Sequence, residues 1–134
     1  MANEATELLQ KVPLFADLDP RELETIARTV HQRTFGAGET IAEEGQSGVG
    51  FFVIRTGEAK VDVGGQEVRR LGAGDYFGEI ALITEGPRTA TVTADSELSC
   101  YGLTPWEFRP LVQTNANIAW KLLQALARQV DQRH

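Results

Sequence analysis

The stretch GDYFGEIALITEGPRTATVTA, residues 74 to 94, carries the most distinctive local chemistry of the chain. One acid, Glu79, follows a glycine, and one arginine, Arg88, follows a proline further along. The segment ends in a strict alternation of threonine with alanine or valine, which is typical of a half-buried strand. Two explanations are open for the charges: they pair with each other across a turn, or both face a ligand.

The glycines divide the sequence around this stretch. All 13 glycines lie between Gly36 and Gly102, and the two ends of the chain have none. Glycine weakens helices and serves tight turns. We therefore expect helices in residues 1–35 and 104–134, and strands joined by turns in residues 36–103.

The middle part contains regularly spaced short runs with the composition of strands. KVDV alternates with period two, and GGQ is typical of a hairpin loop. The expected strands are residues 40–42, 51–54, 58–63, 67–71, 80–82, 89–94 and 97–103. The pattern predicts a mainly β fold, an antiparallel sandwich or barrel, with flanking helices at both ends.

Two helix starts carry the same signal. Asp19 can cap a helix that begins at Pro20, with Glu22 completing a capping box. Thr104, followed by Pro105, begins the second such pattern.

A longer helix is expected from about Asn117. Its apolar residues are predicted to form one face, which either packs on the β domain or forms a dimer seam. These residues are Ile118, Leu122, Leu123, Leu126, Ala127 and Val130.

Composition limits the function classes. The chain has 134 residues, enough for one domain, and a formal net charge of −6. That charge argues against direct nucleic-acid binding, which depends on lysine and arginine. No stretch suggests a membrane span or a signal peptide. The one cysteine, Cys100, lies in an apolar run and is expected to be a buried structural thiol, which fits the cytoplasm.

Catalysis is not expected. The two histidines, His31 and His134, and the single Cys100 are far apart in sequence, so no nucleophile–base pair is evident. The histidine cluster that a metal-binding β-barrel enzyme would need is missing from the sequence. We therefore expect neither a metal nor a cofactor, and we interpret His31 as a structural or surface residue.

The charges around the bend suit a small ligand. Gly78 permits close approach of the backbone, and EIAL could form a short helical turn whose N–H groups bind an anion. Arg88 could bind phosphate oxygens, and Glu79 could accept from a sugar hydroxyl. A cyclic nucleotide has both groups.

The segment resembles the phosphate-binding cassette of the cyclic nucleotide-binding domain family. FGEIAL at residues 77–82 and PRTATV at residues 87–92 match the cassette pattern, and VPLFADLDPRELETIA, GETIAEEGQSG, FFVIRTGEAKV and LTPWEFRPLV resemble other parts of the domain. The resemblance implies a noncatalytic regulatory domain with a β-roll, or jelly roll, between helices. It covers nearly the whole chain.

By position, the resemblance assigns Glu79 to the ribose 2′-hydroxyl and Arg88 to the exocyclic phosphate, with Gly78 permitting the approach. Backbone and side-chain groups around these two residues complete the implied ligand-binding set. They belong to Ile80, Ala81, Thr89 and Ala90.

For the base, the resemblance gives apolar contacts from Val61, Val68 and Leu71. In the catabolite activator proteins an arginine of the C-terminal helix contacts the base; here Gln129 takes that position, and Arg133 and His134 could reach the base instead.

Thr89 bears on the choice between cAMP and cGMP. A hydroxyl there can help to hold guanine, but bacterial cAMP-binding domains carry it too. The sequence hypothesis prefers cAMP, with cGMP as the alternative.

Partners and output also follow from the resemblance. Ligand binding would move the C-terminal helix over the base, with an effector domain or partner protein downstream and a homodimer through that helix as one possibility. Catabolite activator proteins place a helix-turn-helix after the long helix, where this chain ends at His134, so we expect no DNA-binding module. An interaction module with a nonfunctional pocket is the remaining alternative.

Overall fold

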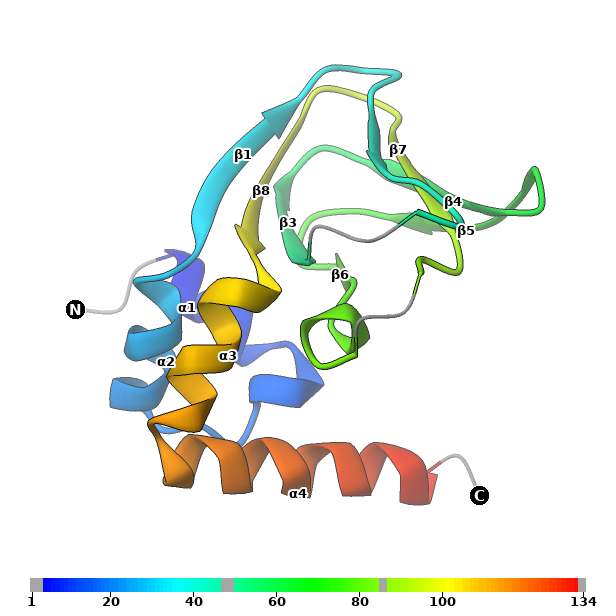
Figure 1. Cartoon of the computed structure of the whole chain (residues 1–134). Helices are drawn as coiled ribbons and strands as arrows, with labels where there is room; N and C mark the ends of the chain where they lie inside the picture. The colour runs from blue at the N-terminus through cyan, green and yellow to red at the C-terminus, as the bar shows by residue number, and fades with distance from the viewer. Residues whose placement is uncertain (1–3, 47–49, 85–86, 133–134) are drawn as a thin grey trace. The chain divides into compact units, whose positions relative to one another are not determined.

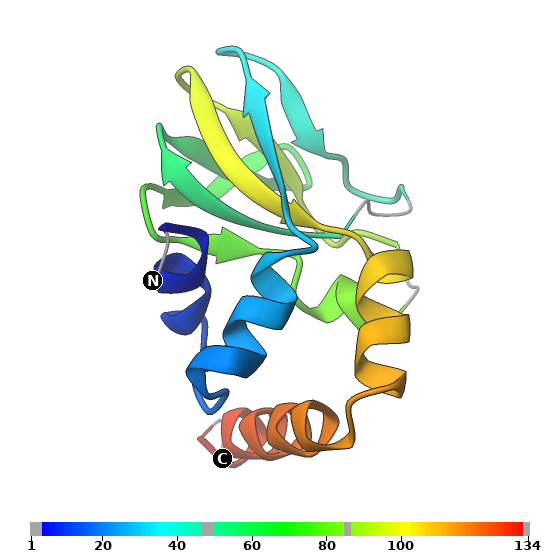
Figure 2. The same cartoon turned by 90° about the vertical axis from the view of Figure 1, so that its left-hand side faces the viewer.

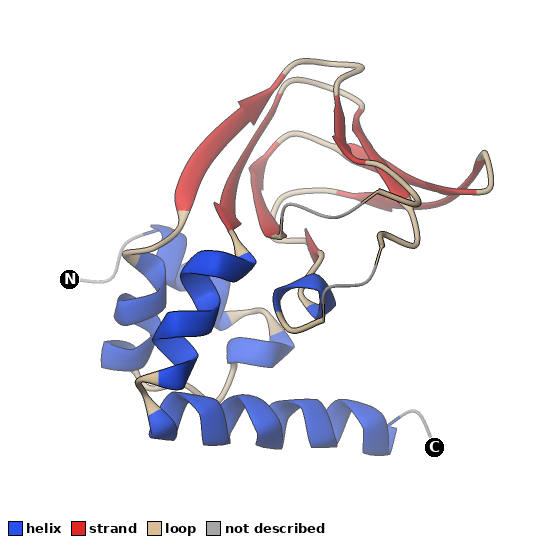
Figure 3. Cartoon of the chain, in the orientation of Figure 1, coloured by secondary structure: helices blue, strands red, loops and turns tan. Residues whose placement is uncertain are grey.

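The computed structural model describes residues 4–46, 50–84 and 87–132. The chain divides into two compact units. A helical unit combines Met1–Val30 with Trp106–His134, and a β unit spans His31–Pro105 (Figures 1 and 3). No helix in the described part of the chain is both long and apolar enough to cross a membrane.

Two helices, α2 and α3, begin where the sequence signals predict. The full set is α1 (Glu4–Gln10), the 3-10 helix η1 (Pro13–Phe15), α2 (Pro20–Ala27), α3 (Pro105–Gln113) and α4 (Ala116–Gln132). The predicted capping box is confirmed: the Asp19 carboxylate accepts from the Glu22 N–H, and the Glu22 carboxylate accepts from the Asp19 N–H, both at 2.9 Å. This satisfies two N–H groups that the first turn of α2 leaves free.

Within the helical unit, α3 and α4 are tied to the N-terminal helices (Figure 2). The rings of Phe15 and Phe108 meet edge to face, with 6.3 Å between their centroids. Lys121 Nζ on α4 lies 2.6 Å from Glu22 Oε1 on α2. Two segments that are almost 100 residues apart in sequence are thereby joined by an apolar contact and an ion pair.

The single apolar face that we expected on α4 divides into two. Ile118 and Leu122 are buried, together with Ala125, whereas Leu123 and Val130 are more than half exposed. The buried residues follow a spacing of four and three, which keeps them on one side of a helix. Leu123 and Val130 lie on another side of the same helix, which leaves a second apolar stripe exposed.

The β unit consists of two antiparallel four-stranded sheets, which confirms the predicted fold class (Figure 2). One sheet has the strand order β1-β8-β3-β6 and the other β2-β7-β4-β5. The strands are β1 (His31–Phe35), β2 (Thr40–Ala42), β3 (Phe51–Thr56), β4 (Ala59–Val63), β5 (Gln66–Leu71), β6 (Tyr76–Phe77), β7 (Thr91–Ala94) and β8 (Leu98–Leu103).

Two local predictions are wrong, and one strand was missed. Residues 80–82 form the 3-10 helix η2 (Ile80–Leu82) instead of a strand, which confirms the alternative expectation of a short helical turn in EIAL. Residues 31–35, expected in the helical N-terminal segment, form the edge strand β1, whose first four residues are exposed and give no alternating pattern. The two-residue strand β6 was not predicted, because so short a run carries no periodicity.

The predicted GGQ hairpin is confirmed between β4 and β5. Gly64 and Gly65 have φ of 58° and 84°, and a two-residue turn with positive φ at both positions matches the twist of the flanking strands. The register then shifts, because Val61 lies opposite Arg69 while Asp62 lies opposite Glu67. The extra residue of this bulge is Val68.

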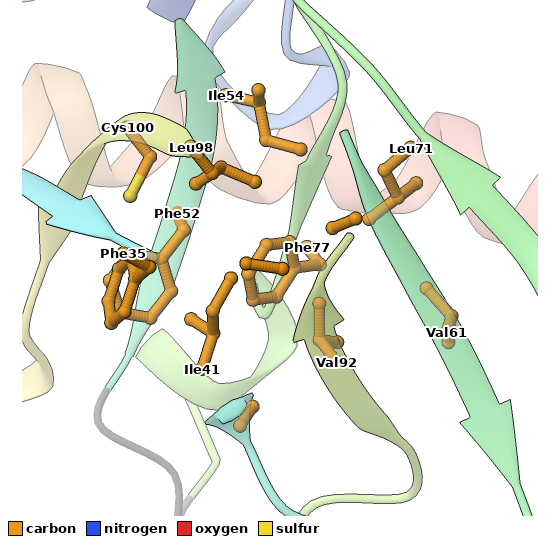
Figure 4. Packing of buried hydrophobic residues seen from close by; sticks show 13 residues of the cluster. Phe35, Ile41, Phe52, Ile54, Val61, Leu71, Phe77, Val92, Leu98 and Cys100 are labelled. Atoms are coloured by element: carbon orange, nitrogen blue, oxygen red, sulfur yellow. The ribbon is translucent and has the colours of Figure 1, made fainter. Parts of the chain in front are cut away.

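The apolar cluster of the β unit is drawn from the facing sides of both sheets (Figure 4). Phe52 of β3 lies between Phe35 and Phe77, with ring centroids 6.2 Å and 5.3 Å away. Cys100 belongs to this cluster, and burial raises the pKa of its thiol to about 11. The prediction of a buried structural thiol is confirmed.

Candidate functional site

The corner between β6 and η2 is built around Gly78. Its φ is +85°, a left-handed conformation that side chains with a Cβ rarely adopt. A methyl group there would overlap the carbonyl oxygen of Gly50 and lie 2.5 Å from Arg88 Nη1. Glycine is therefore required for two reasons: the chain direction at this corner and the space taken by the guanidinium.

The turn after Gly78 is short. The N–H of Ala81 donates to the Gly78 carbonyl at 3.0 Å, and the N–H of Leu82 donates to the Glu79 carbonyl at 3.2 Å. The Ala81 amide, expected near a ligand phosphate, is thus engaged within the turn in this structure. Three residues of 3-10 helix make a small dipole, so the cation at this corner has to come from a side chain.

Arg88 supplies that cation, and its backbone is fixed by a turn at residues 43–46. The Arg88 N–H donates to the Gln46 carbonyl at 2.9 Å, and the Gly45 N–H donates to the Arg88 carbonyl at 2.8 Å. These two bonds set the direction in which the side chain leaves the backbone. The side chain then extends to Gly50, whose carbonyl accepts from Arg88 Nη2.

The guanidinium of Arg88 has a hydrogen-bond donor without an acceptor in the described part of the chain. Its Nε is buried and has no hydrogen-bond partner among the residues that the structure describes. Burial lowers the pKa of Arg88, because removal from water disfavours the charged form. A buried donor on a cation without a partner is costly, so this group is suited to an anionic acceptor.

Glu79 does not neutralise Arg88. Both residues are described, and no ion pair or hydrogen bond joins their side chains. The Glu79 side chain also makes no cap bond to η2. Burial raises the pKa of the nearby Tyr76, and the charge of Glu79 raises it further. The sequence left two explanations open: the two charges pair with each other, or both face a ligand. This arrangement favours the second.

The remaining predicted residues fall into groups. Val61 and Leu71 are buried in the β-unit cluster, against which Ala90 packs. Ile80 and Thr89 are exposed, as is Val68, the bulge residue, at 60%. Arg133 and His134 lie outside the described residues.

Sequence reasoning missed the Gly50 carbonyl. Gly50 has a φ of +123°, and a Cβ there would overlap the carbonyl oxygen of Leu103, so this glycine lets two segments of backbone approach closely. A backbone carbonyl is present at every residue, so the sequence does not reveal which one accepts a hydrogen bond from Arg88. Across the described residues, no group of histidine, cysteine and acidic side chains could hold a metal ion.

Comparisons with known proteins point to one family of domains. The sequence model described as "Cyclic nucleotide-binding domain" matches residues 32–115. A cGMP-dependent protein kinase of Toxoplasma gondii is 36% identical over 100 residues, 75% of this chain and 10% of that protein. A cAMP-dependent protein kinase regulatory subunit of Blastocladiella emersonii is 36% identical over 115 residues, 82% of this chain and 28% of that protein.

A solved structure is also similar. The N-terminal domain of a transcriptional regulator from Streptomyces coelicolor A3(2) superposes with a TM-score of 0.86 at 30% identity, covering 95% of this chain and 94% of that one. The chain therefore spans nearly all of this solved domain but less than a third of either kinase-related protein.

The dual role of Gly78 can be tested by substitution with alanine. We expect Gly78→Ala to lower the free energy of unfolding by more than Gly74→Ala, measured by urea denaturation. Gly74 has a similar φ of +89°, but no heavy atom lies within 4 Å of the place that a methyl group would take. Gly74→Ala therefore isolates the backbone strain, about 1–2 kcal/mol. Equal losses for the two variants would show that the contact with Gly50 and Arg88 is unimportant.

Proposed function

The chain belongs to the cyclic nucleotide-binding domain family, and on that premise we propose that it is a noncatalytic regulatory domain that senses a cyclic nucleotide. The observation that carries the proposal is the partly buried guanidinium of Arg88, with an Nε that has no partner among the described residues. An exocyclic phosphate supplies the oxygens that this cation lacks. Such charge-assisted bonds contribute about 1.5–3 kcal/mol each.

Each group of the ligand has a proposed partner. Arg88 binds the phosphate and exchanges the Gly50 carbonyl for phosphate oxygens, and Glu79 accepts from the ribose 2′-hydroxyl. The residues Ile80, Ala81, Thr89 and Ala90 surround these contacts, and Val61 and Leu71, with Val68, form the apolar side toward the base. The relatives include both cAMP-dependent and cGMP-dependent proteins. cAMP remains the first ligand to test and cGMP the alternative.

The output is proposed to pass through the C-terminal helix to an effector domain or partner protein in the cytoplasm. A net charge of −6 argues against direct contact with nucleic acid. Ligand can shift the helix only if it binds the two positions of the helix with different affinity. The base is then covered by a residue of that helix, for which Arg133 and His134 stay predictions.

We also propose a homodimer through α4. Trp120, Leu123 and Val130 are each more than half exposed and lie on one side of the helix. Their spacing of three and seven residues is that of a coiled-coil seam, which a second α4 can cover.

The roles of Arg88 and Glu79 can be separated by calorimetry. We expect wild type to bind cAMP in the micromolar range or tighter, about −8 kcal/mol, and Arg88→Ala to lose about tenfold to hundredfold in affinity, because a buried charge-assisted contact is removed. Glu79→Ala should weaken binding of cAMP but not of 2′-deoxy-cAMP, which lacks the hydroxyl that Glu79 binds.

The matched control is Arg28→Ala, which removes an exposed arginine beside α2 that pairs with Glu24 and should leave affinity unchanged. Unaltered binding by Arg88→Ala would overturn the phosphate assignment. If wild type binds neither cAMP nor cGMP, the interaction-module alternative replaces the proposal.

Movement of the C-terminal helix can be followed by tryptophan fluorescence. Trp120 of α4 is exposed in the single chain, as is Trp106 of α3. A Trp106→Phe variant that also carries Leu123→Glu, which keeps α4 out of the proposed dimer, leaves Trp120 as the reporter. We expect its emission to change on saturation with cAMP and to stay constant in the Arg88→Ala background at the same cAMP concentration. Calorimetric binding without any change in emission would contradict the proposed movement.

The dimer can be tested by sedimentation velocity. We expect a dimer for wild type and a monomer for Leu123→Glu, because a buried carboxylate in an apolar seam is costly. Gln124→Glu adds the same charge at the neighbouring exposed position and should remain a dimer. A monomeric wild type at all concentrations would refute the seam.

A further inference from the structure

The turn at residues 43–46, which fixes the backbone of Arg88, has no apolar side chain to bury. Its sequence is Glu-Glu-Gly-Gln, all four residues are exposed, and Gly45 has a φ of +85°. A backbone segment with few buried apolar contacts opens more easily than the strands around it. The position of this turn therefore depends on its hydrogen bonds to neighbouring segments.

Glu44 makes two of those bonds, one through its backbone and one through its side chain. Its N–H donates to the Thr91 hydroxyl of β7 at 3.0 Å, and its carboxylate accepts from the Gly64 N–H at 2.9 Å. Gly64 lies 20 residues further along the chain, where it begins the two-residue turn of the β4–β5 hairpin. The carboxylate of Glu44 thus joins the turn to the tip of a separate hairpin.

The same turn bonds to Arg88 immediately beyond Glu44. The Gly45 N–H donates to the Arg88 carbonyl at 2.8 Å, and the Arg88 N–H donates to the Gln46 carbonyl at 2.9 Å. The carboxylate that anchors the turn therefore belongs to the residue next to these two partners of Arg88. If the turn moved away from the hairpin, both bonds would be strained, and the Arg88 side chain would leave the backbone in another direction.

The next step rests on the proposed function, in which Arg88 binds the ligand phosphate. We infer that Glu44 is a positioning residue of the ligand site: its carboxylate ties the turn to the β4–β5 hairpin and so keeps Arg88 where it can bind. It acts through Arg88, without contact to the ligand. When only some molecules hold Arg88 in that position, the apparent affinity for the ligand falls in proportion to their fraction.

The inference also links two parts of the proposed site. Strands β4 and β5 carry Val61 and Leu71, the proposed apolar contacts to the base, and the turn at residues 43–46 holds the proposed phosphate contact. The bond between Glu44 and Gly64 connects that turn to the end of the same two strands. One exposed carboxylate thereby helps to keep the phosphate contact in place relative to the base contacts.

The first test is a double-mutant cycle measured by calorimetry with cAMP. We expect Glu44→Ala to weaken binding by about 3–10-fold, because one hydrogen bond that holds the turn is lost. In the Arg88→Ala background the same substitution should change the affinity by less than about 2-fold, since Glu44 acts through Arg88. Glu44→Gln should keep most of the wild-type affinity, because its amide oxygen can accept from the Gly64 N–H.

The matched control is Glu39→Ala, at the opposite end of β2. Glu39 Oε1 accepts from the Gly36 N–H at 3.1 Å, which is the same kind of bond within a different loop. Glu39→Ala should leave the cAMP affinity within about 2-fold of wild type, since it does not act on Arg88. Urea denaturation verifies that each variant is folded. A loss of equal size for Glu44→Ala with and without Arg88, or for Glu39→Ala, would show general loosening of the β unit and overturn the inference.

Amide hydrogen exchange tests the positioning without a ligand. We expect the Arg88 N–H to exchange about 3–10-fold faster in Glu44→Ala than in wild type, and at the wild-type rate in Glu39→Ala. Unchanged exchange of this N–H in Glu44→Ala would overturn the inference alone. Failure of wild type to bind either cyclic nucleotide would instead overturn the proposed function, and the exchange rates would still decide whether Glu44 positions Arg88.

Discussion

The partly buried guanidinium of Arg88 needs hydrogen-bond acceptors inside the β unit. The backbone segments around it fix its position, leave space for it and provide one of those acceptors. Two backbone bonds to the turn at residues 43–46 fix where Arg88 leaves the chain. Gly78 provides the space, and the Gly50 carbonyl accepts one N–H group of the guanidinium. Its Nε, without a partner among the described residues, leaves a donor for which an anion is the natural complement.

The two sheets position the other residues of the proposed site. Paired strands β4 and β5 bring Val61 and Leu71 into the apolar cluster, and β6 leads directly into the cassette corner. The apolar, acidic and basic residues of the proposed ligand site consequently come from different segments of one β unit. A net charge of −6 is compatible with an anionic ligand, because the local cation matters more than the overall charge.

Features that depend only on residues close together in the chain could be predicted from the sequence. The capping box at Asp19, the hairpin at Gly64 and Gly65 and the cassette motif depend on nearby residues, and all three could be identified without a structure. Features that depend on contacts between distant segments could not be predicted from the sequence. β1 is exposed over four of its five residues, and the acceptor for Arg88 is a backbone carbonyl.

The pairing partners along β5 depended on the register between β4 and β5. A bulge at Val68 decides which residue of β5 lies opposite Val61, and no sequence pattern reports a one-residue shift between strands.

In the proposed binding mode, Arg88 exchanges the Gly50 carbonyl for a ligand phosphate. A crystal structure of the chain with cAMP is the most direct test: we predict Arg88 on the exocyclic phosphate and Glu79 on the ribose 2′-hydroxyl. A nucleotide bound elsewhere, with Arg88 still on Gly50, would contradict this binding mode.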